Sequence, residues 1–379
     1  MSARTDPDTE YELLVAVVTN TVPESTLSLV LDALRREGTE PVDVVVLYTG
    51  SPQAAAGRTL DALLRDRNVD VMRTPHAMRA GEARQFLIEH TARYRFVAFL
   101  DDDCVPLPGW LPAVRAACAD PLPTALFFGP RYPVAAAGAG SLVRALETRS
   151  SRKLALVTGP DAPEAVVDPK VLSAAGNIIV SVAAAGELGL TGPLFSRTAF
   201  EDVDFQLRAA RHGWIVQFHS RLEVEHHDEL DVSALLRKSW HSGKGMARCS
   251  ALYAADFWQR CRWRPWRALV SWAVALACLG AALLQPWAAA GALLPVVANT
   301  CLHLRELRGA PLLHRATYLL VKPVRDLAIG LGFVTHRIAG RFASRPNGNR
   351  VALPAGATTA AAQRGALNER GDMGTSRTH

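Results

Sequence analysis

The feature that most constrains the fold is a regular alternation of short apolar runs with amphipathic helical patterns over the first hundred residues. The apolar runs cover residues 13–18 (LLVAVV), 42–47 (VDVVVL), 69–72 and 96–100 (FVAFL), and the helical patterns cover 26–37, 59–67 and 81–94. Buried parallel strands are continuous β-branched runs joined by crossover helices. The alternation therefore predicts an α/β fold with a mixed, mainly parallel sheet flanked by helices.

The middle of the chain is less regular. We expect strands at ALFFG, in AAGNIIVS, at WIVQFH and at LEVEHH, and a helix over residues 141–156. FEDVDFQLRAARHG has the pattern of a helix that is closed by Gly213. The order of these strands in the sheet does not follow from their sequences.

The C-terminal part changes composition sharply after residue 258. Residues 268–284 and 287–304 are apolar and uncharged, Gln285-Pro286 interrupts them, and arginines flank the pair on both sides. Each half is slightly shorter than the roughly 20 residues that cross a bilayer. The pattern predicts a membrane hairpin over 268–304 with both ends cytoplasmic, followed by amphipathic interfacial helices over 312–342. A buried helical hairpin in a soluble protein is the alternative.

These signals divide the chain into four parts. We expect a disordered N-terminus (1–12), a catalytic domain (13–258), a membrane-associated helical region (259–342) and a disordered tail (343–379). MSARTDPDTEYE lacks the basic and apolar regions of a signal peptide, so we expect a cytoplasmic membrane protein whose catalytic domain faces the cytoplasm.

Charge and cysteine content argue against a nucleic-acid-binding protein, a zinc protein and a disulfide-rich protein. The net charge is +6, but the basic residues are spread along the chain or flank apolar stretches, which favours a membrane surface and no nucleic-acid partner. The six cysteines have no C-x-x-C spacing. They indicate neither a zinc site nor a disulfide framework.

Three consecutive carboxylates, Asp101, Asp102 and Asp103, follow the apolar strand 96–100. Ligands of parallel sheets bind beyond the carboxyl ends of strands, and clustered carboxylates repel one another unless a cation lies among them. Carboxylates suit Mg2+ or Mn2+, which also bind nucleotide phosphates. The triplet predicts a divalent-metal site. The alternative is that one Asp caps the helix near Trp110 and the others are solvated.

Two later features could belong to the same site. Glu201-Asp202, with Asp204 behind it, opens an amphipathic helix, where acids are also ordinary complements of the helix dipole. His226 and His227 follow a predicted strand. A neutral imidazole can join a carboxylate-bound Mn2+, although a lone His in such a place is usually structural or exposed.

The order of these features resembles the family 2 glycosyltransferases, which are inverting enzymes of the GT-A fold. The resemblance spans roughly residues 13–250 and rests on VAVVTN, GEAR, FVAFLDDDCVPLPGW, AAGN and FEDVDFQLRAARHGW. The specific passages are FLDDDCVPLPGW and EDVDFQLRAARHG. With its apolar C-terminal segments, the chain resembles a membrane-associated bacterial-type member of this family.

The resemblance implies roles for individual residues. Asp101 and Asp103 would lie at the metal, diphosphate and ribose, with Asp103 the direct ligand and His226 a further one. Asp202 would be the general base. The implied donor-binding residues also include Thr19, Asn20, Arg84 and Asp102.

The basic segment RKSWHSGKG leaves two interpretations open. Its side chains could contact the acceptor or the diphosphate, or its basic residues could contact lipid headgroups. The residues concerned are Lys238, Trp240, His241 and Lys244, and Glu201 is a further possible contact.

The reaction that the resemblance implies is sugar transfer from a nucleotide-diphosphate donor to a hydroxyl of a lipid-linked or cell-envelope glycan. The Q-x-x-R-W signature of processive members is absent, which favours non-processive transfer, and the loop YTGSPQ lacks the Asp that often touches the base. Two alternatives are a membrane-anchored nucleotide-sugar-binding module without turnover and a nucleotidyltransferase. The latter normally has a Gly-rich, basic phosphate loop, which TNTVPEST does not provide.

Overall fold

The structure is a computed structural model, and it describes part of the chain. The described residues are 11–22, 24–37, 42–50, 55–65, 69–134, 165–167, 172–173, 175–192, 199–227, 232–261, 264–285, 291, 294–301 and 312–343. The helix predicted over 141–156, the predicted tail over 343–379 apart from residue 343, and most of the predicted disordered N-terminus lie outside them.

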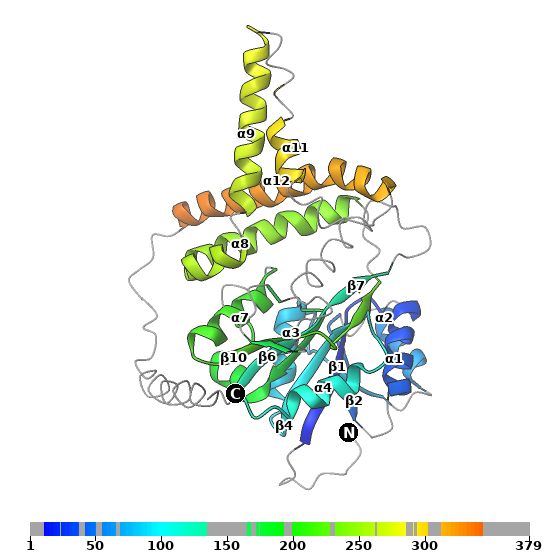
Figure 1. Cartoon of the computed structure of the whole chain (residues 1–379). Helices are drawn as coiled ribbons and strands as arrows, with labels where there is room; N and C mark the ends of the chain where they lie inside the picture. The colour runs from blue at the N-terminus through cyan, green and yellow to red at the C-terminus, as the bar shows by residue number, and fades with distance from the viewer. Residues whose placement is uncertain are drawn as a thin grey trace, which may run out of the picture.

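An eight-stranded sheet with the order β3-β2-β1-β4-β9-β6-β10-β8 forms the centre of the molecule (Figure 1). The strands β1 to β4 are parallel, β6 pairs parallel to β10, and β9 runs antiparallel between β4 and β6. This confirms the prediction of a mixed, mainly parallel sheet. The strands are β1 (Tyr11–Thr19), β2 (Asp43–Tyr48), β3 (Asp70–Arg73), β4 (Tyr94–Asp101), β6 (Thr124–Phe128), β8 (Ala165–Val167), β9 (Asn177–Ser181) and β10 (Ile215–His219).

Helices cover both faces of this sheet, which explains the continuous apolar strands. Successive side chains of β1 enter opposite cores: Val15 and Val17 pack with α1, α2 and α4, whereas Leu14 and Ala16 pack with α3, α6 and α7. The helices are α1 (Glu24–Glu37), α2 (Ala55–Leu64), α3 (Ala80–Glu89), α4 (Trp110–Cys118), α6 (Val182–Leu188) and α7 (Glu201–Arg211).

The predicted helix 81–94 was too long at its C-terminal end. The structure ends α3 at Glu89, and Tyr94 begins β4. The Thr91 hydroxyl donates to the Leu87 carbonyl at 2.9 Å, and the Tyr94 N–H donates to the Thr91 carbonyl at 3.0 Å. The Tyr94 hydroxyl then donates to Asp43 at 2.6 Å, so a tertiary contact fixes a residue that its local sequence leaves ambiguous.

A second, three-stranded sheet lies at the edge where β4 ends. It has the order β5-β11-β7, with β5 at Cys104–Pro106, β7 at Arg131–Pro133 and β11 at Val224–His226. β11 is antiparallel to β5 and parallel to β7. This small sheet brings the segment after the acidic triplet beside His226, more than a hundred residues later.

Long helices form the C-terminal part: α8 (Val232–Cys261), α9 (Arg264–Ala282), α11 (Leu294–Cys301) and α12 (Leu312–Ala343). α8 and α12 lie across one another above the sheet, and α9 projects away from them (Figure 1). The predicted hairpin region thus contains α9 and α11, and the predicted interfacial stretch is a single helix. The predicted end of the catalytic domain at residue 258 falls inside α8.

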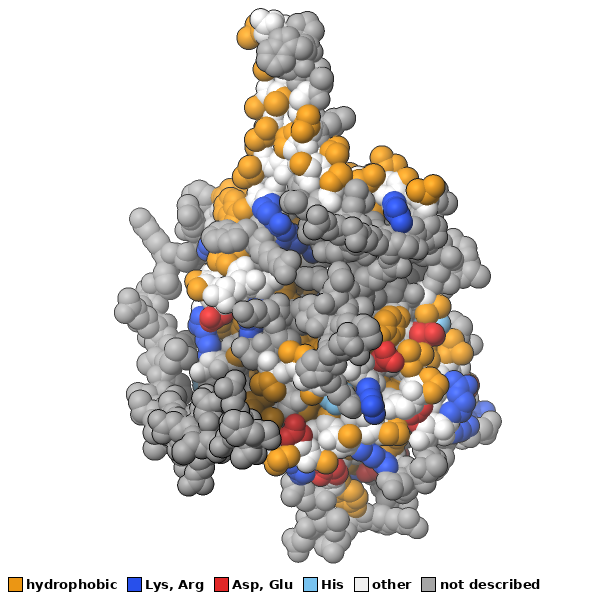
Figure 2. Space-filling model, in the orientation of Figure 1, with side chains coloured by type: hydrophobic (Ala, Val, Ile, Leu, Met, Phe, Trp, Pro, Cys, Tyr) orange, Lys and Arg blue, Asp and Glu red, His pale blue; other side chains and the backbone are white. Residues whose placement is uncertain are grey.

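The projecting helix is apolar on its exposed surface. Among the described residues, α9 alone is long and apolar enough to cross a membrane, and 17% of its apolar window is buried. Its exposed side chains include Val270 (58%), Leu276 (63%) and Leu279 (51%). Figure 2 shows hydrophobic side chains along the projection and Lys or Arg side chains near its base.

Glycines allow α8 and α12 to cross with their backbones in contact. A Cβ on Gly243 would lie 2.1 Å from the Ile329 carbonyl oxygen, and one on Gly332 would lie 2.2 Å from the Trp240 carbonyl oxygen. Because both obstacles are backbone atoms, side-chain rotation cannot relieve the overlap.

We expect Gly243→Ala to lower the stability of the full-length protein by about 1 to 3 kcal/mol, since the helices must separate to admit the methyl group. Gly186→Ala in α6 is the matched control, because a Cβ there meets nothing within 4 Å. It should be neutral or stabilising by about 0.5 to 1 kcal/mol. Thermal unfolding in detergent measures both, and equal midpoints for the two variants would contradict the close crossing.

Candidate active site

The acidic triplet lies where β4 leaves the large sheet. The Asp102 N–H donates to the Val18 carbonyl of β1 at 3.1 Å, and the Asp101 N–H donates to the Gly176 carbonyl at 3.2 Å. The loops that follow β1, β2 and β4 therefore meet at one edge, as the sequence predicted. Asn20 is exposed there, and its carbonyl oxygen is 2.8 Å from where a Cβ on Gly50 would lie.

Arg84 of α3 joins two acidic segments that are far apart in sequence. Its buried guanidinium forms an ion pair with Asp101 at the end of β4 and a second, at 3.5 Å, with Glu201 of α7. Only 3% of the Arg84 side chain is exposed, and Phe99 lies 6.0 Å from its guanidinium. Gly81, one turn earlier, leaves room for Glu201, whose Cγ would be 2.9 Å from a Cβ at that position.

Asp102 points back toward β1 rather than toward Arg84. The Thr19 hydroxyl donates to its carboxylate and accepts from the Val22 N–H at 3.1 Å. Burial raises the pKa of Asp102 to about 7, and the charges of Asp103 and Asp101 act in the same direction. Asp102 therefore takes up a proton more readily than Asp103 does.

Asp103, Cys104 and His226 form a compact cluster whose ligand atoms all lie within 4.8 Å of one another. Asp103 Oδ2 is 3.4 Å from His226 Nε2, and the Cys104 thiol donates to Asp103 Oδ1 at 3.5 Å. Burial acts to raise the pKa of Asp103, but the hydrogen bond and charge of His226 outweigh it and lower the pKa to about 2. Asp103 is thus an anion that faces an imidazole nitrogen.

Asp202 lies in the first turn of α7. Burial raises its pKa, while the Val203 N–H and the guanidiniums of Arg84 and Arg131 act in the opposite direction. The residue before the helix, Phe200, has a φ of 83°, which is uncommon for a non-glycine residue. The first turn of α7 is connected to the triplet through Arg84, which contacts both Glu201 and Asp101.

Arg131 of β7 is a site residue that sequence reasoning missed. Burial lowers its pKa, but nearby acidic groups raise it overall. These groups are Cys104, Asp101, Asp103 and Asp202. Arg131 follows the apolar strand ALFFG in the segment GPRYP. A charged residue soon after an apolar strand is the same pattern that singled out the three aspartates. Arg131 lies within electrostatic reach of both the triplet and Asp202.

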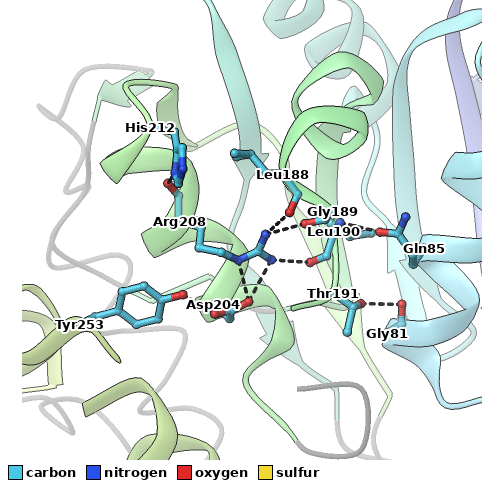
Figure 3. A network of polar contacts seen from close by, with 10 residues as sticks. All are labelled: Gly81, Gln85, Leu188, Gly189, Leu190, Thr191, Asp204, Arg208, His212 and Tyr253. Atoms are coloured by element: carbon cyan, nitrogen blue, oxygen red, sulfur yellow. Dashed lines mark hydrogen bonds and ion pairs between the residues drawn. The ribbon is translucent and has the colours of Figure 1, made fainter. Parts of the chain in front are cut away.

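A polar network behind the site holds α7 in place (Figure 3). Arg208 pairs with Asp204 at 2.9 Å and donates to the carbonyls of Leu188, Gly189 and Leu190. The Tyr253 hydroxyl of α8 donates to the other Asp204 oxygen. From the far side, the Thr191 hydroxyl donates to the Gly81 carbonyl of α3 at 2.8 Å. The helix that carries Glu201 and Asp202 is therefore bound to both α3 and α8.

The basic side chains of α8 lie in two different environments. Lys238 is near enough to Asp103 to lower its pKa. Lys244 lies 5.8 Å from the Trp240 ring centre and within electrostatic reach of His336 on α12. His241 is exposed. Lys238 thus faces the acidic site, whereas Lys244 is directed toward the α12 side.

The donor set fits a divalent cation. An ionised carboxylate and an imidazole nitrogen face each other across 3.4 Å, and two further carboxyl groups, Asp101 and Asp102, precede Asp103 in sequence. Burial raises the pKa values of three neighbouring acids, Asp102, Glu201 and Asp202, and the charges of adjacent carboxylates act in the same direction on Asp102 and Glu201. A cation would favour the ionised forms of these acids. The cluster differs from the predicted ligand set, since Cys104 joins it while Asp101 is paired with Arg84.

Comparisons with known proteins point to one family. Residues 14–134 match the model of glycosyl transferase family 2. This range includes the triplet and Arg131 and ends before Asp202 and His226. No curated protein matches the chain.

Solved structures resemble the chain at 14% identity. One is GalNAc-T7 with UDP, GalNAc and Mn2+, with a TM-score of 0.46 over 66% of this chain and 52% of that one. Another is the mannosyltransferase PcManGT from Pyrobaculum calidifontis with GDP-Man and Mn2+, with a TM-score of 0.49 over 89% of both chains. This chain therefore spans about half the length of the GalNAc-T7 chain.

Glu201 makes stability depend on pH. Burial and the charge of Asp202 raise its pKa to about 7, so the folded protein retains a proton that the unfolded chain has already lost. The resulting stabilisation is present below the ordinary carboxyl pKa and is lost as the pH rises through 7. Without metal, we expect stability to fall between pH 5 and pH 8, and Glu201→Gln to reduce that fall by on the order of 2 kcal/mol.

Chemical denaturation in EDTA at several pH values measures this dependence. Glu12→Gln is the control, because Glu12 is an exposed surface acid with 47% of its side chain accessible. An unchanged pH slope in Glu201→Gln would contradict the raised pKa.

Proposed function

We propose that the chain acts as a family 2 glycosyltransferase, whose model residues 14–134 match. It transfers a sugar, with inversion, from a nucleotide diphosphate to an acceptor hydroxyl. The main support for this proposal is that the triplet, His226 and the first turn of α7 lie at one edge of the sheet. Arg84 links α7 to the triplet there. A Mn2+ or Mg2+ ion held by Asp103 and His226 would neutralise charge on the departing diphosphate.

Asp202 is the proposed general base. It lies in the first turn of α7, where burial raises its pKa and thereby its affinity for a proton, while the guanidiniums of Arg84 and Arg131 act in the opposite direction. As the acceptor oxygen attacks the anomeric carbon, the hydroxyl proton passes to the Asp202 carboxylate and the bond to the diphosphate breaks. A direct displacement inverts the anomeric centre and needs no enzyme nucleophile.

The basic residues around the carboxylates have a complementary role. Arg131 and Lys238 lie within electrostatic reach of Asp103, so they are placed to attract the diphosphate of the donor. Thr19, the last residue of β1, and Asn20 after it would line the nucleotide pocket, and the Thr19 hydroxyl donates to Asp102. Trp240 and His241 are proposed acceptor contacts.

We further propose that the acceptor is a lipid-linked or cell-envelope glycan at the cytoplasmic leaflet. α9 is 19 residues long, or about 28 Å, close to the roughly 30 Å of a bilayer core. Apolar side chains of α12 such as Leu320, which is 74% exposed, would lie at the same membrane surface. Transfer of single sugars fits the lack of a Q-x-x-R-W signature.

Donor turnover tests the function. Purified protein in detergent is offered UDP-, GDP- and dTDP-sugars with Mn2+ or Mg2+ and a candidate acceptor, and nucleotide release is measured. We expect Asp202→Asn to lower transfer about 10²- to 10⁴-fold while donor binding persists, since it removes only the base. Asp103→Asn should weaken metal-dependent donor binding itself.

Asp61→Asn is the matched control, because Asp61 is an exposed α2 residue paired with Arg73. Donor binding without turnover in the wild type, unaffected by Asp202→Asn, would instead support a membrane-anchored binding module. Transfer of the nucleotidyl group to the acceptor would identify a nucleotidyltransferase.

Membrane attachment is tested separately by flotation with anionic lipid vesicles. The double variant Leu276→Arg/Leu279→Arg places two charges on the exposed surface of α9, each costing about 2.5 to 3.5 kcal/mol at a bilayer centre. We expect it to lose vesicle binding. Leu122→Arg, at a 42% exposed position of the catalytic domain, should float like the wild type. Equal flotation of all three proteins would refute insertion of α9.

A further inference from the structure

A cluster of basic side chains lies where α8 and α12 cross. Arg248 of α8 donates from Nε to His336 Nε2 of α12 at 3.1 Å. Lys244 lies one helical turn before Arg248 on the same side of α8, and it is within electrostatic reach of His336. The crossing therefore brings a lysine, an arginine and an imidazole together from two helices.

Burial and like charge both act against protonation in this cluster. Burial lowers the pKa of Arg248. Burial is also the largest cause of the lowered pKa of His336, and the charges of Arg248 and Lys244 add to it. The imidazole is therefore neutral at pH 7 and accepts the hydrogen bond from Arg248. An anion beside the two cations would offset the cost of burying them.

The hydrogen bond from Nε fixes the plane of the Arg248 guanidinium. Guanidinium groups bind phosphate oxygens through parallel N–H donors, so their orientation matters. Lys244 supplies a second cation, and its Nζ lies 5.8 Å from the centre of the Trp240 ring. A fixed guanidinium with an ammonium group one turn away suits a phosphate ester.

The cluster lies beside the base of α9. The Phe333 ring of α12 contacts the Trp266 ring of α9, with 5.3 Å between the ring centres, and His336 follows Phe333 by about one turn. Among the described helices, α9 is the one long and apolar enough to cross a membrane. Leu331 and Ile338, on either side of His336 in sequence, are exposed. With α9 in the bilayer, the basic cluster lies at the level of the lipid headgroups.

α8 also connects the cluster with the active site. Burial raises the pKa of the Cys249 thiol, and the charges of Asp204 and Asp202 act in the same direction. Arg248 thus immediately precedes a residue within electrostatic reach of the proposed base. A lipid phosphate at Arg248 would be held on the helix that packs against α7.

We propose that Lys244 and Arg248, with His336 as an orienting residue, bind the phosphate group of a membrane lipid. The proposal rests on the proposed function for the position of α9 in the bilayer, and it adds a binding site and the chemistry of its ligand. A lipid fits better than free phosphate, because exposed apolar side chains flank the cluster on α12. An anionic headgroup fits better than phosphatidylcholine, whose own cation would repel the two basic residues.

Isothermal titration calorimetry tests the site with full-length protein in a neutral detergent. The probes are micelles that contain phosphatidylglycerol or phosphatidylcholine. We expect phosphatidylglycerol to bind about tenfold or more tightly than phosphatidylcholine, and Lys244→Gln/Arg248→Gln to lose about tenfold or more of that affinity. Arg337→Gln, which removes an exposed charge next to His336, is the matched control. It should lose less than about threefold, because salt screens an exposed charge.

Inorganic phosphate gives a second measurement, on the wild type, that does not depend on the folding of a variant. At constant ionic strength it should displace phosphatidylglycerol, whereas chloride should not. Equal binding of the two lipids, equal losses in Arg337→Gln and the double variant, or inorganic phosphate that binds as tightly as the lipid would each overturn the proposal. Phosphate-selective lipid binding by a protein without sugar transfer would refute the proposed function alone.

Discussion

The ion pairs of Arg84 are the interaction on which the site depends. A buried guanidinium needs polar partners, and here they are the Asp101 carboxylate at the end of β4 and the Glu201 carboxyl group in the first turn of α7. Asp101 and Glu201 are a hundred residues apart, and the helix that carries Glu201 also carries Asp202. Burying Arg84 is costly unless both carboxyl groups contact it. This requirement helps to hold the proposed base at the same edge of the sheet as the triplet.

The same helix is held from the opposite side by α8. The Tyr253 hydroxyl donates to Asp204, and a Cβ on Gly245 would lie 2.4 Å from the Ala199 carbonyl oxygen, just before the strained turn at Phe200. α8 in turn contacts α12 through the backbone crossing at Gly243. The catalytic domain and the C-terminal helices are therefore packed together through α8, which belongs as much to the site as to the helical region.

The sequence predicted what local pattern and strand order determine. The early strands, the mainly parallel sheet and the position of the triplet at a strand end all follow from apolar runs that stop at polar residues. It did not predict what depends on pairing between distant segments. Cys104 was set aside because no second cysteine lies at a metal-binding spacing, yet its partner in the cluster is a histidine on another strand. Arg131 was missed for the same reason, and the end of α3 depended on the contact between Tyr94 and Asp43.

Charge balance explains why this arrangement calls for a cation. Five carboxyl groups, Asp101, Asp102, Asp103, Glu201 and Asp202, share a neighbourhood with three basic side chains, Arg84, Arg131 and Lys238. Burial is the largest cause of the raised pKa values of Asp102, Glu201 and Asp202, and neighbouring carboxylates add to it at Asp102 and Glu201. A nucleotide diphosphate would add further negative charge to the same place. A divalent ion beside Asp103 would reverse that imbalance, so donor binding and ionisation of the proposed base would both be favoured by the same ion.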